Sequence, residues 1–295
     1  MKEKNVHARS RGVDHFMTGV FYIVGGSAIL LLLVLAGYII IKGIKSYYPG
    51  VMGFTDAGIG NQLFNTIYLV VLSLIVSVPL GMAAGTYLSE YAKQGKLTEI
   101  ITMSIEALSS LPSIVIGLFG YLVFILMTGA QSNLLAGAMV VTILSIPQIT
   151  STTRDALKAL PDYYRTGSIG LGASTFQTIW HVLIPACIPR VVTGIILVAG
   201  RGFGEAAALL YTTGQSTIID WSNWNLASST CPLNPMRPGE TLALHVWMMR
   251  TEGSMVQHST EIANISSMIL VIAVLIFNLA ARLISARIVK KNRGA

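Results

Sequence analysis

The sequence predicts an all-α integral membrane protein with about six transmembrane helices. Of the 295 residues, 53% are apolar and only 11% are charged, and the mean hydropathy is +0.66. A soluble domain would carry about 25% charged residues, so a soluble globular enzyme is excluded. The apolar residues fall in blocks of ~20, which is the length that crosses a hydrocarbon core. The net charge of +7 comes from basic residues beside these blocks, so we expect no nucleic-acid partner.

Six apolar blocks follow one another along the chain, and we interpret each as one membrane span. The first block is too long for a signal-peptide core and lacks a small-x-small cleavage site, so we expect a retained helix. Pro112 and Pro147 lie near one end of the third and fourth blocks and predict kinks, which membrane helices tolerate. The blocks run approximately over residues 17–41, 65–88, 105–127, 133–149, 191–210 and 262–284.

The distribution of the 20 Lys and Arg residues predicts the orientation of the spans. Fifteen fall on the side of both termini, four on the opposite side, and Arg201 lies within a span. Because positive charge stays in the cytoplasm, both termini are expected to be cytoplasmic. The expected parts are a cytoplasmic N-terminal tail (1–16), a first transmembrane helix (17–41), a core (65–285) and a basic cytoplasmic tail (286–295). The core contains an inner loop at about 150–190 and an outer loop at about 212–261.

The inner loop has the pattern of two short helices joined by a turn. Pro161 suits a first helical position, and Gly172 suits a turn that ends a helix. Ser174, with Gln177 three residues later, forms a capping box that starts another helix. Pro185 is expected to bend the chain back into the membrane. Such a loop offers a docking surface to a cytoplasmic partner, and a plain connection between two spans is the alternative.

Arg201 is a charged residue inside a predicted span. It lies near the middle of the stretch from Val191 to Leu210, where a guanidinium costs at least ~2.5 kcal/mol, so it is not expected to face lipid. Glu205 follows four residues later, and on a helix the two would share one face and partly neutralise each other. An arriving anion would compete with Glu205 for the guanidinium, whose planar fork matches two phosphate oxygens. A permanent structural ion pair is an equal alternative.

Other reactive side chains are interpreted as structural. Glu106, near the start of the third block, is assigned a capping role, because a carboxylate is favoured at a helix N-terminus. Cys187 and Cys231 fall on opposite sides of the membrane and cannot pair. The His and Cys residues lack metal-ligand spacing, so no metal site is expected. The chain also lacks a clustered catalytic set, so we do not expect an enzyme.

The inner loop resembles the cytoplasmic "EAA" loop of ABC importer permeases. That loop reads Glu-Ala-Ala, three residues, Gly, nine residues and Ile-x-Leu-Pro, and Gly172 and Pro185 stand at the matching positions. Val182 and Ile184 replace the usual Ile and Leu, and Thr-Gly-Ser at 166–168 replaces Glu-Ala-Ala, so no role that needs the acidic side chain is implied. The ATPase-coupling residues that the resemblance implies are Arg165, Thr166, Gly167, Ser168, Gly172, Val182, Ile184 and Pro185.

Further segments narrow the resemblance to the PstA-type permease subunit of phosphate ABC importers, one of the binding-protein-dependent transport system inner membrane components. Proteins of this type have six spans in the type I ABC importer permease fold, with cytoplasmic coupling helices. The resemblance covers nearly the whole chain. The segments that carry it are Gly58–Asn61, Pro79–Gly81, Tyr87–Tyr91, Leu111–Tyr121 and Arg201–Glu205.

The resemblance implies a non-catalytic subunit of an ATP-driven importer that carries inorganic phosphate across a prokaryotic cell membrane. Its partners would be the lipid bilayer, a sister permease (PstC-like), two ATPase subunits (PstB-like) and an external phosphate-binding protein (PstS-like). No cofactor is expected on this chain: ATP is used by the partner, and the pair Gly95-Lys96 is followed by Leu97, so the phosphate-cradling loop is missing. The substrate pathway would include Arg201 and Glu205.

Two other functions remain alternatives to phosphate import. One intramembrane arginine suits sulfate, molybdate or phosphonate as well as phosphate. A stand-alone channel or secondary transporter is disfavoured, because internal repeats or more intramembrane ionisable groups would then be expected.

Overall fold

The computed structural model describes residues 2–55, 58–93, 95–216, 218–253 and 257–293, and of these it places all side chains except those of 2–13, 284 and 288–293. Within these ranges the chain is helical and has no strand, which confirms the expected all-α class. Met1 of the expected N-terminal tail, and Gly294 and Ala295 of the expected basic tail, lie outside the described residues. The helices are α1 (Lys2–Lys45), α2 (Gly60–Thr86) with the π-helical turn η1 (Tyr87–Tyr91), α3 (Lys96–Ser110), α4 (Ser113–Gly120) with η2 (Tyr121–Leu126), α5 (Leu134–Lys158), α6 (Tyr163–Gly170), α7 (Thr175–Thr178) with η3 (Ile179–Leu183), α8 (Ile184–Phe203), α9 (Leu242–Thr251) and α10 (Ser259–Arg293).

Helices α2 and α5 form the centre of the bundle, and a stripe of small residues on α2 lets them approach closely. Ser73, Ser77, Gly81 and Gly85 recur every four residues on one face of α2, and all four are buried. A Cβ atom at Gly85 would lie 2.6 Å from the backbone oxygen of Thr150 in α5. Such stripes allow van der Waals contact between backbones, which holds membrane helices together where lipid offers no hydrophobic drive.

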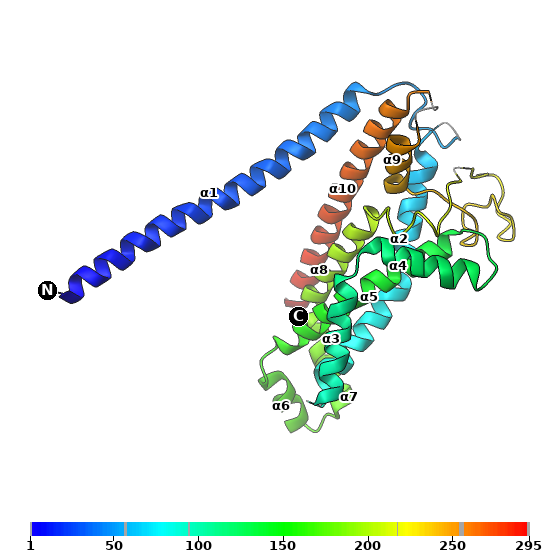
Figure 1. Ribbon diagram of the computed structural model, residues 1–295. Coiled ribbons are helices and arrows are strands. Elements are labelled where there is room, and N and C mark those ends of the chain that lie inside the picture. Colours follow the sequence, from blue (N-terminus) through cyan, green and yellow to red (C-terminus); the bar gives the residue numbers. More distant parts are fainter. Residues whose placement is uncertain (1, 56–57, 94, 217, 254–256, 294–295) are drawn as a thin grey trace.

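Helices α8 and α10 pack around this pair and complete the bundle. Phe203 of α8 packs against Phe277 of α10, with ring centroids 5.1 Å apart, and it belongs to one buried apolar cluster with Val70 of α2 and Ala199 of α8. Figure 1 shows α6 and α7 gathered at one end of the bundle and α9 at the other. We call these the α6 end and the α9 end.

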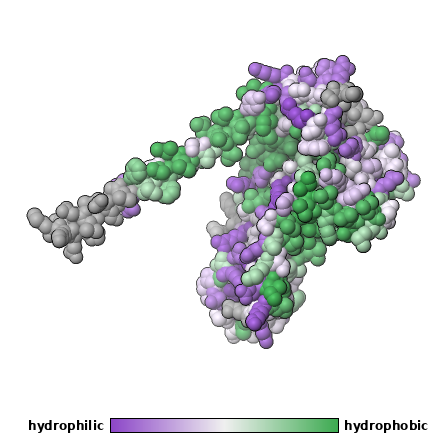
Figure 2. Space-filling view, viewed as in Figure 1, coloured by the Kyte–Doolittle hydropathy of each residue, from purple (hydrophilic) through white to green (hydrophobic). Residues whose placement is uncertain are grey.

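Helix α1 leaves the bundle and extends away from it (Figure 1). It packs against α10 near its own Lys45 end, where Gly43 lies against the side chain of Met268. The most apolar stretch of α1 has no buried residue, and Figure 2 shows its apolar side chains on the surface. This surface requires lipid or another subunit to cover it, because exposed apolar area on this scale is not stable in water.

The expected number of spans agrees with the structure, but three spans have different bounds, and the fourth span runs from Leu134 to Lys158 and not to 149. In the described ranges five helices are long and apolar enough to cross a membrane, and a sixth span is formed if the bent pair α3 and α4 is counted as one. The fifth span runs from Thr175 to Phe203, and not from 191 to 210. Pro185 does not turn the chain back as predicted: it directly follows the π-helical turn η3 and lies inside the continuous helical stretch from Thr175 to Phe203.

The third expected span is broken in two. Helix α3 starts at Lys96, well before the expected residue 105, and it meets α4 at an angle of 99°. The break falls at Pro112, which is extended and serves as the N-cap of α4; the residue before a proline is disfavoured in the helical conformation. The kink predicted at Pro112 is therefore a sharp turn, whereas Pro147 lies inside α5 without interrupting it.

Candidate functional site

The turn in the inner loop has the local structure that the sequence predicts. Gly172 has a φ of +89°, a conformation that glycine adopts without steric cost. Ser174 caps α7: its Oγ accepts the N–H of Gln177 at 3.3 Å, and its own N–H donates to Oε1 of Gln177 at 2.9 Å. Helix α6 begins at Tyr163, two residues after Pro161. The second short helix is continuous with the following span and is not a separate element.

A hydrogen bond ties α6 to α7 across this turn. The hydroxyls of Ser168 and Thr178 lie 2.9 Å apart, and Thr178 is buried. Behind them, Ile179 and Leu183 of η3 belong to a buried apolar cluster with Leu157 of α5. The turn is therefore attached to the bundle by its η3 side.

Arg165 on α6 forms an ion pair with Glu90 at the end of α2. Its Nη2 and Nε donate to the two carboxylate oxygens of Glu90 at 2.8 and 3.0 Å. The same guanidinium also donates to the backbone oxygens of Leu157 and Leu160 at 3.0 and 3.2 Å. The hydrogen bonds that Arg165 donates to Glu90 hold the pKa of its guanidinium above the usual value. One side chain therefore connects α2, the end of α5 and α6, since bidentate charge-assisted bonds fix geometry as well as charge.

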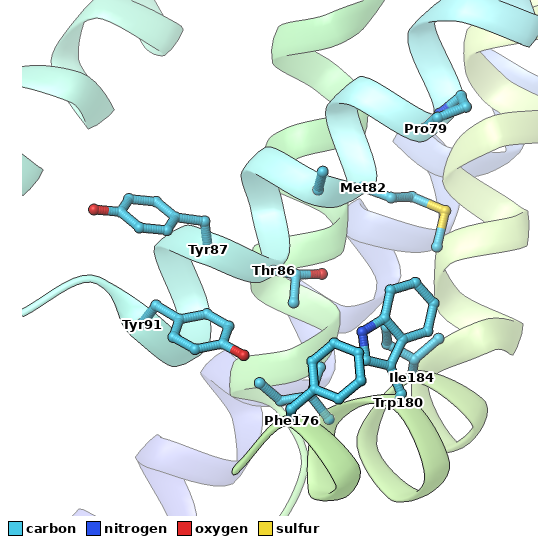
Figure 3. Close-up of a pocket in the computed structure, with 10 residues that line it drawn as sticks. Pro79, Met82, Thr86, Tyr87, Tyr91, Phe176, Trp180 and Ile184 are labelled. Atoms are coloured by element: carbon cyan, nitrogen blue, oxygen red, sulfur yellow. The ribbon is translucent and has the colours of Figure 1, made fainter.

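An apolar groove open to the surface lies beside this junction, and its lining residues Phe176, Trp180 and Tyr91 are about half exposed. The groove has a volume of about 420 Å³ and separates the end of α2 from α7 and α8. Figure 3 shows Met82, Thr86 and Tyr91 on the α2 side facing Phe176 and Trp180 on the other. The end of α2 is therefore separated by open space from α7 and α8. It is joined to α6 by the direct contact between Glu90 and Arg165.

The surface of α6 and its turn carries exposed apolar side chains. Leu171 is 92% exposed, Tyr163 is 65% exposed and Ile169 is 54% exposed. Thr166 and Gly167 are also exposed, next to them on α6. An apolar knob with small neighbours at one end of a bundle is typical of an interaction surface. Of the other expected coupling residues, Ser168, Val182 and Ile184 are half-buried, and Gly172 and Pro185 are exposed.

Arg201 and Glu205 do not form the helical pair expected from their spacing. Helix α8 ends at Phe203, with Gly204 as its C-cap, so the two residues do not share a helix face. Gly200, Gly202 and Gly204 each weaken a helix by about 1 kcal/mol relative to Ala, which explains the early end. Arg201 is exposed, and within the described part of the chain it forms no ion pair. Glu205 is 9% exposed, and its Oε1 accepts the N–H of Ala208 at 3.2 Å.

The segment between α8 and α9 folds over the α9 end of the bundle and is held there by a buried arginine. Arg237 is 0% exposed. It donates to the side-chain oxygen of Asn65 on α2 and to the backbone oxygen of Pro232 at 3.3 Å. Burial lowers the pKa of the Arg237 guanidinium to about 10, so it stays protonated near neutral pH. Glu240 and His245 form a second buried contact at 2.7 Å.

Sequence reasoning missed the structural roles of Glu90 and Arg237. Glu90 stands in the recognised Tyr87–Tyr91 segment, but its partner lies 75 positions away, so spacing gives no signal. Arg237 is one of the four basic residues on the side opposite the termini, and the charge distribution predicts no further role for it. Cys187 and Cys231 are both free and buried, in agreement with the expectation that they do not pair.

Comparison with known proteins identifies relatives for almost the whole chain. Residues 77–294 match the family model described as binding-protein-dependent transport system inner membrane component. The chain is 42% identical to the probable ABC transporter permease protein YqgI of Bacillus subtilis, over 94% of this chain and 97% of that protein. It is 33% identical to the phosphate transport system permease protein PstA of Xylella fastidiosa, over 52% of this chain and 54% of that protein.

Solved structures share the fold at low sequence identity. A chain of a bacterial alginate ABC transporter superposes with a TM-score of 0.66 at 13% identity, covering 91% of this chain and 94% of that one. A chain of the inward-facing MetNI methionine ABC transporter gives 0.58 at 17% identity, covering 82% of this chain and 99% of that one. With the helical bundle and the EAA-like turn described above, these matches show that the chain belongs to the binding-protein-dependent transport system inner membrane component family, as a PstA-type ABC transporter permease subunit.

Proposed function

We propose that this permease subunit carries inorganic phosphate into a prokaryotic cell, in a complex that uses ATP. The support is the identity of about one third to proteins named as phosphate permeases, together with an intramembrane arginine suited to an anion. The proposed complex contains a sister permease, two ATPase subunits that use the ATP, and an external phosphate-binding protein. This chain contributes no catalytic residue and no cofactor.

The α6 end is proposed to face the cytoplasm and to dock on the ATPase subunits. The support is the excess of Lys and Arg on the side of both termini and the exposed apolar knob formed by Tyr163, Ile169 and Leu171. In this arrangement movement of the ATPases reaches the bundle through α6, the Gly172 turn and η3. Arg165 would pass part of that movement directly to α2.

Arg201 is the observation that supports the substrate pathway most directly. It is exposed near the end of a membrane-spanning helix and has no carboxylate partner in the described part of the chain. A guanidinium in that position is too costly to face lipid, so it must meet water, an anion or another subunit. Its planar fork suits the oxygens of a phosphate, and Glu205, four residues later, accepts the N–H of Ala208 and does not occupy the guanidinium.

Uptake of radiolabelled phosphate tests this proposal, in cells that lack the gene and in cells that regain it, with sulfate as competitor. We expect uptake to return with the gene and to resist excess sulfate. Competition by sulfate, with no phosphate uptake, would instead assign another oxyanion. Loss of uptake with Arg201→Gln at normal complex abundance supports the pathway role, and Arg201→Lys should rescue only partly because an ammonium lacks the two-donor fork.

A purely structural role of the two residues, without an ion pair between them, makes a different forecast. If Arg201 and Glu205 only stabilise the assembly, Arg201→Gln and Glu205→Gln should both reduce the amount of complex in the membrane. Full uptake by Arg201→Gln would end the pathway proposal. Measurement of complex abundance beside uptake therefore separates the two roles.

A further inference from the structure

Glu106 is not at a helix N-terminus, contrary to its expected capping role. Helix α3 starts at Lys96 and ends at Ser110, so Glu106 lies in its last two turns, where the helix dipole disfavours a carboxylate. At 1.5 Å per residue it stands about 15 Å along the axis from Lys96. Its side chain is exposed, and within the described part of the chain it has no ion-pair partner. The structure therefore leaves the role of this carboxylate open.

The exposed side of helix α3 has a polar flank and an apolar flank. The helix packs on α5 through a side where Ile101 and Ile105 are half-buried, and it has no fully buried residue. At 3.6 residues per turn, polar residues lie within an arc of about 80° around the helix axis, to one side of the α5 contact. The residues to the other side of that contact are mainly apolar. The polar flank contains the exposed Glu99, Glu106 and Ser110 and the half-buried Thr102, and the opposite flank contains Leu97, Ile100, Ser104 and Leu108.

The hydroxyl groups of α3 tolerate lipid, but the carboxylate does not. Ser104 donates to the backbone oxygen of Ile100 at 2.9 Å, and Ser110 donates to that of Ala107 at 2.8 Å. Each hydroxyl is thus satisfied by its own helix. A carboxylate that faces hydrocarbon costs roughly 2.5 kcal/mol or more. The Glu106 flank must therefore contact either water or another protein surface.

We infer that the Glu106 flank of α3 lines a water-filled part of the translocation pathway. A single cation of a neighbouring subunit would neutralise Glu106 alone. The flank, however, carries two exposed carboxylates about two turns apart, Glu99 near the start of α3 and Glu106 in its second half, and acidic groups spaced along one flank suit water. Figure 1 shows α3 beside α5, with its outward side free of other helices of this chain. The inference rests on the chain being a permease and not on the solute that it carries.

Cysteine accessibility tests this inference with a matched control on the same helix. In the intact transporter, with both native cysteines replaced by alanine, Glu106→Cys and Ser110→Cys probe the polar flank. Ser104→Cys probes the apolar flank, about 160° around the axis from Glu106. All three positions are exposed in this chain. The reagent is a membrane-impermeant quaternary-ammonium methanethiosulfonate, applied in parallel to intact cells and to inverted vesicles, so the result does not depend on the orientation proposed above.

We expect the two polar-flank cysteines to react at least about tenfold faster than Ser104→Cys, because a thiol in lipid does not ionise and the thiolate is the reactive form. Ser110→Cys keeps the Glu106 carboxylate, so it remains informative if Glu106→Cys fails to assemble. Equal rates on both flanks would overturn the inference, because α3 would then be wet all round. Protection of all three positions would also overturn it, because the polar flank would then be covered by protein. A failed phosphate assay would leave these labelling results unchanged.

Discussion

The ion pair between Arg165 and Glu90 is expected to couple movement of α6 to α2, and the cost of removing it can be worked out from its burial. Glu90→Gln keeps the shape of the side chain but removes its charge and one acceptor of the bidentate pair. The Glu90 side chain is 8% exposed and that of Arg165 is 23% exposed. Loss of one partner of a fully buried pair costs roughly 3–5 kcal/mol. Arg165 is partly hydrated and keeps the backbone oxygens of Leu157 and Leu160, so we expect a smaller cost of about 2 kcal/mol.

This cost should appear as misplacement of α6 and not as loss of the whole fold, because the η3 cluster holds the rest of the turn in place. Two kcal/mol corresponds to about thirtyfold in an equilibrium constant. We therefore expect Glu90→Gln to weaken binding of the ATPase subunits by up to that factor, and to lower the solute transported per ATP hydrolysed. Reconstituted vesicles in which uptake and ATP hydrolysis are measured together give both quantities.

Two controls make the experiment specific. Ser89→Ala removes a hydrogen bond of 2.8 Å that a hydroxyl donates to the same carboxylate; it leaves both bonds from Arg165 in place, so it should cost less than Glu90→Gln, about 1.5 kcal/mol. A double-mutant cycle with Glu90→Gln and Arg165→Gln should give a coupling energy of roughly 1–2 kcal/mol. Additive effects in this cycle, or wild-type coupling in Glu90→Gln, would refute the idea that the pair links α6 to α2.

Three further changes test other parts of the structure. Gly172→Val should cost about 1–3 kcal/mol at the positive-φ turn and uncouple transport from ATP hydrolysis while membrane insertion persists. Normal uptake would contradict this. Gly170→Ala, where an added Cβ meets open space, is the control. Gly85→Ala should destabilise the bundle by roughly 1–3 kcal/mol through contact with α5, and an unchanged melting temperature would argue against close packing there. An impermeant thiol reagent should label the exposed Ser229→Cys in intact cells, whereas native Cys231, which is 0% exposed, resists it until denaturation; labelling of Ser229→Cys only in inverted vesicles would reverse the proposed orientation.

Features that depend on local sequence could be predicted from the sequence. The all-α class and the number of spans follow from apolar length, because a bilayer fixes how many residues a span needs. The Gly172 turn and the Ser174 cap follow from residues within a few positions of each other. The EAA-like spacing also lies within one short segment, so it was sufficient to find the family.

Features that depend on distant residues were decided only by the tertiary structure. The partner of Arg165 is 75 positions away, and Arg237 reaches Asn65 across 172 positions; neither pairing has a sequence period. The Arg201–Glu205 spacing predicted a shared helix face, but α8 ends at Phe203, between them, where glycines alternate with other residues. The role of Glu106 changed because α3 starts earlier than its apolar block. In each case the surroundings of a charged side chain depend on where a helix begins or ends and on which segment packs beside it. Hydropathy and residue spacing do not determine either of these.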